Sequence, residues 1–125
     1  MRLLLISNST NAGEPYLQYP MPQIGDFLKG ITEIVFVPYA AVSFSYAEYE
    51  AKVQKRFDEL GIRVRSVHRS KNPAKLIREA QAICVGGGNT FALARKMQQQ
   101  KLMTAIKNKI AQGTPYVGWS AGSNV

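Results

Sequence analysis

Short apolar segments alternate with stretches of helical periodicity along the whole chain, and this alternation constrains the fold more than any other feature. We expect five strands, over Leu3–Ser7, Glu33–Val37, Ile62–Val67, Ala82–Gly86 and Pro115–Trp119. We expect helices between them, over about Pro22–Lys29, Ser45–Leu60, Asn72–Ala80, Thr90–Gln98 and Leu102–Ala111. Strands that alternate with helices pair in parallel through right-handed crossovers. Residues 1–125 therefore predict a single α/β domain with a doubly wound, mostly parallel, flavodoxin-like sheet.

Local signals support these boundaries and rank the strands by burial. Ser45 and Glu48 have capping-box spacing, and Asn72-Pro73 places a capping residue before a first-turn proline. The segment Ile62–Val67 alternates apolar and charged residues, which indicates an edge strand or a strand with one solvated face. The segment Ala82–Gly86 is continuously apolar, as expected for a strand buried on both faces.

Composition excludes several classes of protein. The single cysteine, Cys84, allows no internal disulfide, and one cysteine with one histidine is too few for a zinc site within one chain. The apolar N-terminus is too short for a signal peptide or a membrane span, so we expect a cytoplasmic protein and treat the sequon at Asn8 as chance. The net charge of +8 favours an anionic partner. No basic run interleaved with aromatics indicates a nucleic-acid module, and we expect neither nucleic acid nor membrane as a partner.

The polar and glycine-rich segments of the chain follow the predicted strands. In a doubly wound sheet ligands bind beyond the carboxyl ends of the strands. Those ends carry Ser7–Thr10, Tyr39-Ala40, His68-Arg69, Gly86–Thr90 and Gly118–Gly122. We therefore expect them to converge on one rim, as a small-molecule site requires.

The last of these segments, Gly118-Trp119-Ser120-Ala121-Gly122, matches the pattern G-x-S-x-G. After a strand, this pattern places the serine on a tight turn with its hydroxyl exposed, which suits a nucleophile. The two glycines would remove side chains that collide across the turn, and the Ala121 N–H would point toward the group under attack. The plainer alternative is a glycine-rich turn in which Ser120 only caps a helix.

The segment Gly86-Gly87-Gly88-Asn89-Thr90 follows the buried strand and opens a helix. Consecutive glycines let a backbone approach a ligand and aim N–H groups at it. Phosphate binding fits poorly, because the Walker lysine is absent and the dinucleotide fingerprint fails at Phe91. An oxyanion hole suits a neighbouring serine better. A turn that only reverses the chain remains the alternative.

Together these motifs resemble peptidase E, the α-aspartyl dipeptidase family of serine peptidases. The resemblance runs from "LLLISNST" through "VHR" and "VGGGNTF" to "YVGWSAGSN", and Ser123 departs from the alanine expected there. The resemblance implies a fold akin to class I glutamine amidotransferases and cofactor-free hydrolysis of dipeptides with N-terminal aspartate. Ser120 matches the nucleophile, and Gly88 and Ala121 match the oxyanion-hole N–H donors. The similar cyanophycinases are an alternative.

The resemblance also implies that the catalytic histidine and its acidic partner lie beyond the nucleophile turn. We therefore expect the fold to be truncated after that turn, the base to be absent and the chain alone to be inactive. A non-catalytic remnant and a nucleotide-binding module are the rival interpretations. We further expect the fifth strand to be left as an open edge, through which two copies could form a homodimer.

Three further residues belong to the expected rim. We expect Asn89, Ser9 and His68 on the substrate side; His68, as the only histidine, is also a candidate for the base of Ser120. Cys84 reads as a small buried hydrophobe and Trp119 as a core residue.

Overall fold

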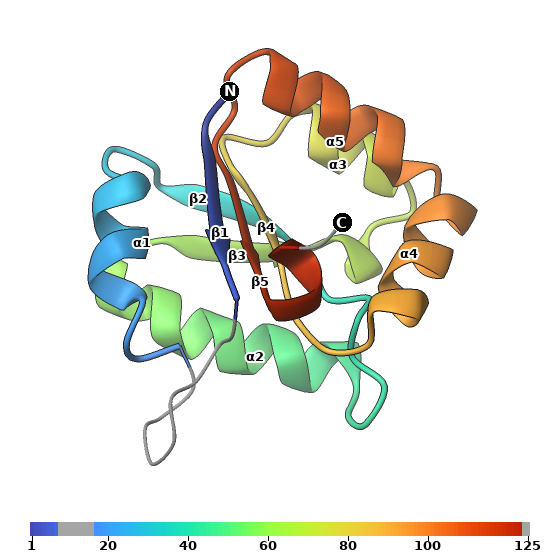
Figure 1. The fold of residues 1–125 in the computed structure, drawn as a ribbon, viewed down its shortest axis with the longest axis horizontal. Coiled ribbons are helices and arrows are strands. Elements are labelled where there is room, and N and C mark those ends of the chain that lie inside the picture. Colours follow the sequence, from blue (N-terminus) through green and yellow to red (C-terminus); the bar gives the residue numbers. More distant parts are fainter. Residues whose placement is uncertain (8–16, 124–125) are drawn as a thin grey trace.

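A computed structural model of the chain describes residues 1–7 and 17–123 and is a three-layer α/β structure (Figure 1). Its central sheet has five parallel strands in the order β1-β5-β4-β2-β3. The strands are β1 (Leu3–Ile6), β2 (Glu33–Val37), β3 (Arg63–Ser66), β4 (Ile83–Val85) and β5 (Tyr116–Trp119). The predicted fold class is confirmed, and each strand lies within its predicted segment.

Helices cover both faces of the sheet (Figure 1). One face carries α1 (Met21–Phe27) and α2 (Tyr46–Phe57), and the other carries α3 (Pro73–Arg78), α4 (Thr90–Gln99) and α5 (Leu102–Ala111). Three short 3-10 helices complete the described elements: η1 (Asp58–Leu60), η2 (Val67–Arg69) and η3 (Ser120–Ser123). Each face has its own apolar cluster, so the sheet is buried from both sides.

Helix boundaries follow the capping chemistry of the sequence. The Ser45 hydroxyl accepts from the Glu48 N–H at 3.1 Å, and the Glu48 carboxylate accepts from the Ser45 N–H at 3.4 Å, which is the predicted capping box. The Asn72 carboxamide oxygen likewise accepts from the Lys75 N–H at 3.2 Å. The helix predicted over Pro22–Lys29 runs instead over Met21–Phe27, one residue earlier at its start and two at its end.

The position of β5 corrects one expectation. This strand is no open edge: it lies between β1 and β4 and pairs with both. The chain crosses from β1 to the distant β2, which leaves β1 outermost, whereas the flavodoxin order places the first strand inside the sheet. Leu3 and Leu5 of β1 are 42% and 53% exposed. The fifth strand therefore cannot serve as the predicted pairing edge, and a homodimer of this chain stays a prediction.

The burial of individual side chains agrees with the strand assignments. The central strand β4 is buried throughout, and β3 alternates exposed and buried residues at the edge of the sheet. Trp119 and Cys84 are fully buried, as predicted, and burial raises the pKa of the Cys84 thiol.

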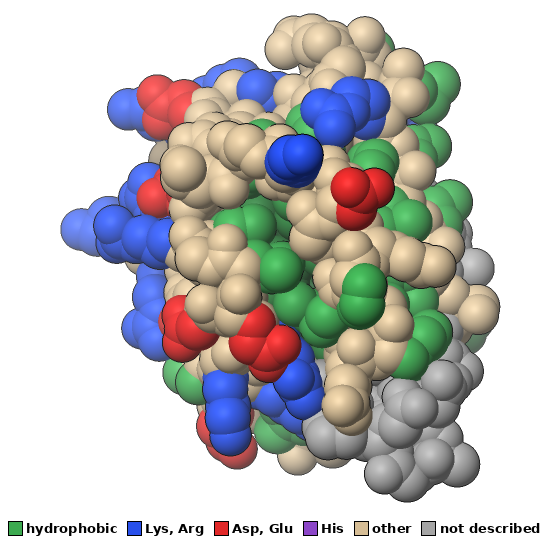
Figure 2. Space-filling model, turned by 90° about the vertical axis from the view of Figure 1, so that its left-hand side faces the viewer, with side chains coloured by type: hydrophobic (Ala, Val, Ile, Leu, Met, Phe, Trp, Pro, Cys, Tyr) green, Lys and Arg blue, Asp and Glu red, His purple; other side chains and the backbone are tan. Residues whose placement is uncertain are grey.

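Figure 2 looks onto the side covered by α1 and α2, where hydrophobic side chains show in the middle and Lys and Arg gather along one margin. Within the described residues, no helix has the length and apolar character needed to cross a membrane.

Candidate active site

The carboxyl ends of the parallel strands bring two predicted motifs together. Ser120 directly follows β5, and the segment Gly86-Gly87-Gly88 directly follows β4, the neighbouring strand. The two motifs touch: a Cβ added to Gly87 would lie 2.5 Å from the Ser120 Cβ and 3.0 Å from the Ser120 Oγ. The expectation that the glycine loop and the serine share one rim is confirmed.

Ser120 has the backbone conformation of a sharp turn. Its φ is +53°, in the left-handed region that residues with a side chain rarely occupy. Such a conformation costs about 1–3 kcal/mol and persists only where the surrounding structure enforces it. Here β5 ends immediately before Ser120 and η3 begins at it, and the side chain is partly buried. This strand-turn-helix arrangement is the one that presents a nucleophilic serine.

The flanking glycines allow the turn to close. A Cβ on Gly118 would overlap the Gly122 carbonyl, and a Cβ on Gly122 would overlap the Val85 carbonyl of β4. The Tyr116 hydroxyl donates to the Gly122 carbonyl oxygen at 2.7 Å and closes the turn from inside the core. Burial raises the pKa of Tyr116, so this hydroxyl remains a donor. The predicted collision across the turn is confirmed at both glycines.

The glycine loop presents the Gly88 N–H at the rim. Gly88 is exposed and has a φ of +138°, and a Cβ there would overlap the Ala40 carbonyl. The same carbonyl accepts from the Asn89 N–H at 2.9 Å, which holds the loop against the end of β2. Across the described part of the chain, the Gly88 N–H has no hydrogen-bond partner. The Ala121 N–H lies in the first turn of η3, where N–H groups lack intrahelical acceptors.

A buried tyrosine of α2 links the two motifs. The Trp119 indole N–H donates to the Tyr49 hydroxyl at 3.1 Å, and that hydroxyl donates to the Gly87 carbonyl oxygen at 3.2 Å. Tyr49 is 2% exposed, and its ring meets Phe36 edge-on with centroids 5.0 Å apart. In sequence, Tyr49 is one apolar position of an amphipathic helix, so no local signal marks this bond.

His68 lies away from Ser120. It belongs to η2, after the edge strand β3, and three strand spacings, about 14 Å, separate β3 from β5. Its ring packs against Tyr46, and its Nδ1 hydrogen-bonds the Ser66 hydroxyl. Burial lowers the pKa of His68; Glu50 opposes this shift and Arg69 adds to it. The structure therefore does not bring His68 and Ser120 together.

The cavity beside His68 is small and aromatic. It has a volume of about 200 Å³, and Tyr39, Tyr46 and Lys96 contribute to its wall. Burial, with a smaller contribution from Tyr46, raises the pKa of Tyr39 to about 12.

Of the other predicted rim residues, Asn89 is exposed and uses its carboxamide oxygen to cap α4, accepting from the Ala92 N–H at 2.9 Å. Ser9 lies outside the described residues.

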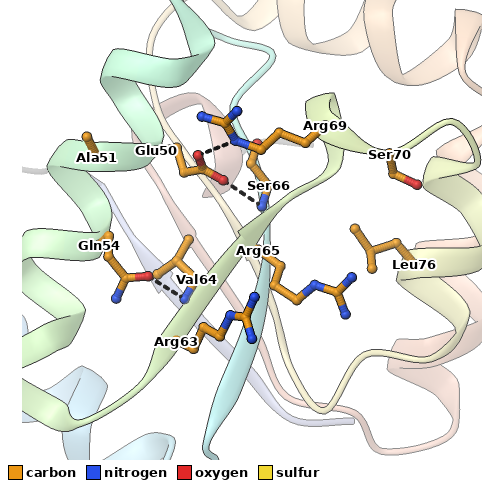
Figure 3. Close-up of a pocket in the computed structure, with 10 residues that line it drawn as sticks. All are labelled: Glu50, Ala51, Gln54, Arg63, Val64, Arg65, Ser66, Arg69, Ser70 and Leu76. Atoms are coloured by element: carbon orange, nitrogen blue, oxygen red, sulfur yellow. Dashed lines mark hydrogen bonds and ion pairs between the residues drawn. The ribbon is translucent and has the colours of Figure 1, made fainter.

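A groove of about 550 Å³ lies along the outer edge of β3 and not at Ser120 (Figure 3). Side chains of α2 close this edge: Gln54 accepts from the Val64 N–H at 2.8 Å, and Glu50 accepts from the Ser66 N–H at 3.1 Å. Arg69 pairs with Glu50 at 2.6 Å. Side chains of α2 thus cap the outer edge of β3, and the Glu50 carboxylate is engaged by the Ser66 N–H and by Arg69. Among the described residues, no cluster of three or more His, Cys, Asp or Glu could hold a metal ion.

The sequence and the fold are both similar to those of known proteins. A family model, Peptidase family S51, matches residues 3–125. Peptidase E from a Nostoc species is 48% identical over 99% of this chain and 52% of its own length, and peptidase E from Haemophilus influenzae is 44% identical over 98% and 57%. The crystal structure of a Listeria monocytogenes protein described as peptidase E has a TM-score of 0.73 and 25% identity over 96% of this chain and 58% of its own. The chain spans about half the length of the curated relatives it matches. This chain belongs to peptidase family S51.

Proposed function

We propose that residues 1–125 are the nucleophile-bearing part of a serine-type dipeptidase that cleaves dipeptides with N-terminal aspartate. The observation that carries the proposal is the left-handed turn at Ser120, packed against a glycine loop whose Gly88 N–H has no hydrogen-bond partner among the described residues. Family membership supports peptidase chemistry, and the relatives carry the name peptidase E. Cytoplasm is the compartment we propose.

The proposed reaction begins with attack by the Ser120 hydroxyl oxygen on the carbonyl carbon of the N-terminal aspartyl residue. A base takes the hydroxyl proton, and the N–H groups of Gly88 and Ala121 stabilise the negative charge on the carbonyl oxygen. The C–N bond then breaks, and the protonated base returns its proton to the leaving amine. Water attacks the resulting ester by the same route and releases aspartate. No cofactor enters these steps.

His68 does not supply the base of this reaction, because it follows β3, which lies three strand positions away from β5. We propose that a histidine outside residues 1–125 takes the proton, and that these residues alone do not turn over substrate. The competing function is ligand binding without hydrolysis. It is favoured by the absence of a histidine beside Ser120 in the described structure.

The proposed substrate class is tested by comparing aspartyl-alanine with its neutral isostere asparaginyl-alanine in the full-length protein. We expect kcat/KM for the aspartyl dipeptide to be higher by at least about 10-fold, since one engaged charge contributes roughly 1.4 kcal/mol or more. Equal rates for the two dipeptides would contradict the specificity. Hydrolysis of neither would favour the competing function.

A further inference from the structure

The Tyr49 hydroxyl lies where the nucleophile turn and the glycine loop meet. It accepts from the indole of Trp119, the residue before Ser120, and donates to the carbonyl of Gly87, the residue that touches Ser120. The loop approaches Tyr49 closely, because a Cβ on Gly86 would overlap the Tyr49 hydroxyl and lie 2.9 Å from its ring atom Cε2. One hydroxyl from α2 is thus bonded to the ends of both β4 and β5.

The bond to Gly87 acts on Gly88 through the geometry of the peptide unit. The Gly87 carbonyl and the Gly88 N–H belong to one planar trans peptide, so they point in opposite directions. A peptide between two glycines is easily rotated, since neither residue has a side chain to bar other φ and ψ values. A hydrogen bond that fixes the carbonyl toward Tyr49 therefore fixes the N–H on the opposite side.

We propose that Tyr49 is a positioning residue: its hydroxyl locks the Gly87–Gly88 peptide so that the Gly88 N–H is presented to the oxyanion at Ser120. This inference rests on the proposed function, because it assigns Gly88 a donor role there. Gly88 is exposed and its N–H has no partner among the residues that the structure describes, which fits that role, and the bond from Trp119 sets Tyr49 relative to the serine turn as well. Tyr49 thereby fixes the Gly88 N–H and Ser120 relative to each other without contacting the substrate.

The test is Tyr49→Phe in the full-length protein, with Tyr46→Phe as its matched control. Tyr46 is on the same helix and also loses a hydroxyl, but its ring faces Tyr39 and His68. We expect Tyr49→Phe to shift the amide resonances of Gly87 and Gly88 and the indole N–H resonance of Trp119, while Tyr46→Phe leaves them in place. For the aspartyl dipeptide we expect kcat to fall by about 10- to 100-fold with KM nearly unchanged, as for a weakened oxyanion donor.

The outcomes separate this inference from the proposed function. If the wild-type protein hydrolyses no dipeptide, the proposed function fails, whereas the amide resonances still report whether Tyr49 sets the loop. Unchanged Gly88 resonances in Tyr49→Phe, or equal shifts in both variants, would overturn the positioning role. Loss of the folded state in Tyr49→Phe, measured by circular dichroism, would also overturn it, because the hydroxyl would then maintain the core rather than one peptide.

Discussion

The two halves of the rim are built on different principles. At the ends of β4 and β5, the serine backbone is strained, the glycines are closely packed, and the Gly88 N–H has no hydrogen-bond partner in the described part of the chain. At the ends of β2 and β3, by contrast, side chains dominate: His68 bonds Ser66 and packs on Tyr46, and Tyr39 has a raised pKa. We propose that backbone geometry, and not the titratable residues of this rim, marks its reactive place. Variants that compare the two halves of the rim test this proposal.

The largest effect is expected from Ser120→Ala, with Ser66→Ala as a matched serine in the other half of the rim. Removing the nucleophilic oxygen should lower kcat for the aspartyl dipeptide by at least about a thousandfold, since only binding and oxyanion stabilisation remain. Ser66→Ala removes a hydroxyl bonded to His68 and should change kcat by less than about 10-fold. Steady-state kinetics of the full-length protein measure both. Comparable losses in the two variants would erase the distinction between the halves.

A smaller but still large effect is expected from Gly87→Ala. The new Cβ would meet the Ser120 side chain and the Trp119 carbonyl, neither of which can yield without moving the turn. Overpacking of this kind costs about 1–3 kcal/mol, and we expect kcat/KM to fall by about 100-fold, as for a misplaced catalytic group. Thermal unfolding and kinetics measure the two effects.

The control for that variant is Gly25→Ala in α1. Its Cβ would meet only the end of the flexible Leu60 side chain, 2.9 Å away, and alanine favours a helix by up to about 1 kcal/mol. Stability and kcat/KM should stay near the wild-type values. If Gly87→Ala behaved like Gly25→Ala, close packing at Ser120 would not matter to the reaction.

The smallest effect on catalysis is expected from His68→Gln, with kcat/KM changing by less than about 3-fold. The variant should instead alter how stability depends on pH. Burial lowers the pKa of folded His68 below its ordinary 6.5, so the unfolded chain binds more protons as pH falls through that value. The free energy of unfolding therefore decreases as pH drops below about 6.5 and levels off below the folded pKa.

Chemical denaturation between pH 4 and pH 8 tests this expectation, because the His68→Gln chain should lack that part of the pH dependence. A loss of activity as large as that of Ser120→Ala would instead make His68 part of the catalytic machinery.

The sequence predicts some of these features because their causes are local. The strand before Ser120, the need for glycine at 118 and 122, and the buried character of β4 each follow from a few neighbouring residues. The pairing of β1 with β5 does not follow from neighbouring residues, because it depends on how far the chain crosses the sheet before β2 forms. The Tyr49 bond is missed for a similar reason. Its partners Gly87 and Trp119 are 38 and 70 residues away, and a helical tyrosine facing a sheet reads as core.

The most direct test of the central claim is covalent labelling of the full-length protein with a phosphonofluoridate, followed by peptide mass spectrometry. The reagent reacts with an activated serine, and its phosphonyl group occupies the place of the tetrahedral intermediate. We predict one adduct, on Ser120, formed at similar rates in the wild-type and His68→Gln proteins. An adduct on another serine, or an adduct on Ser120 that disappears in His68→Gln, would contradict the account.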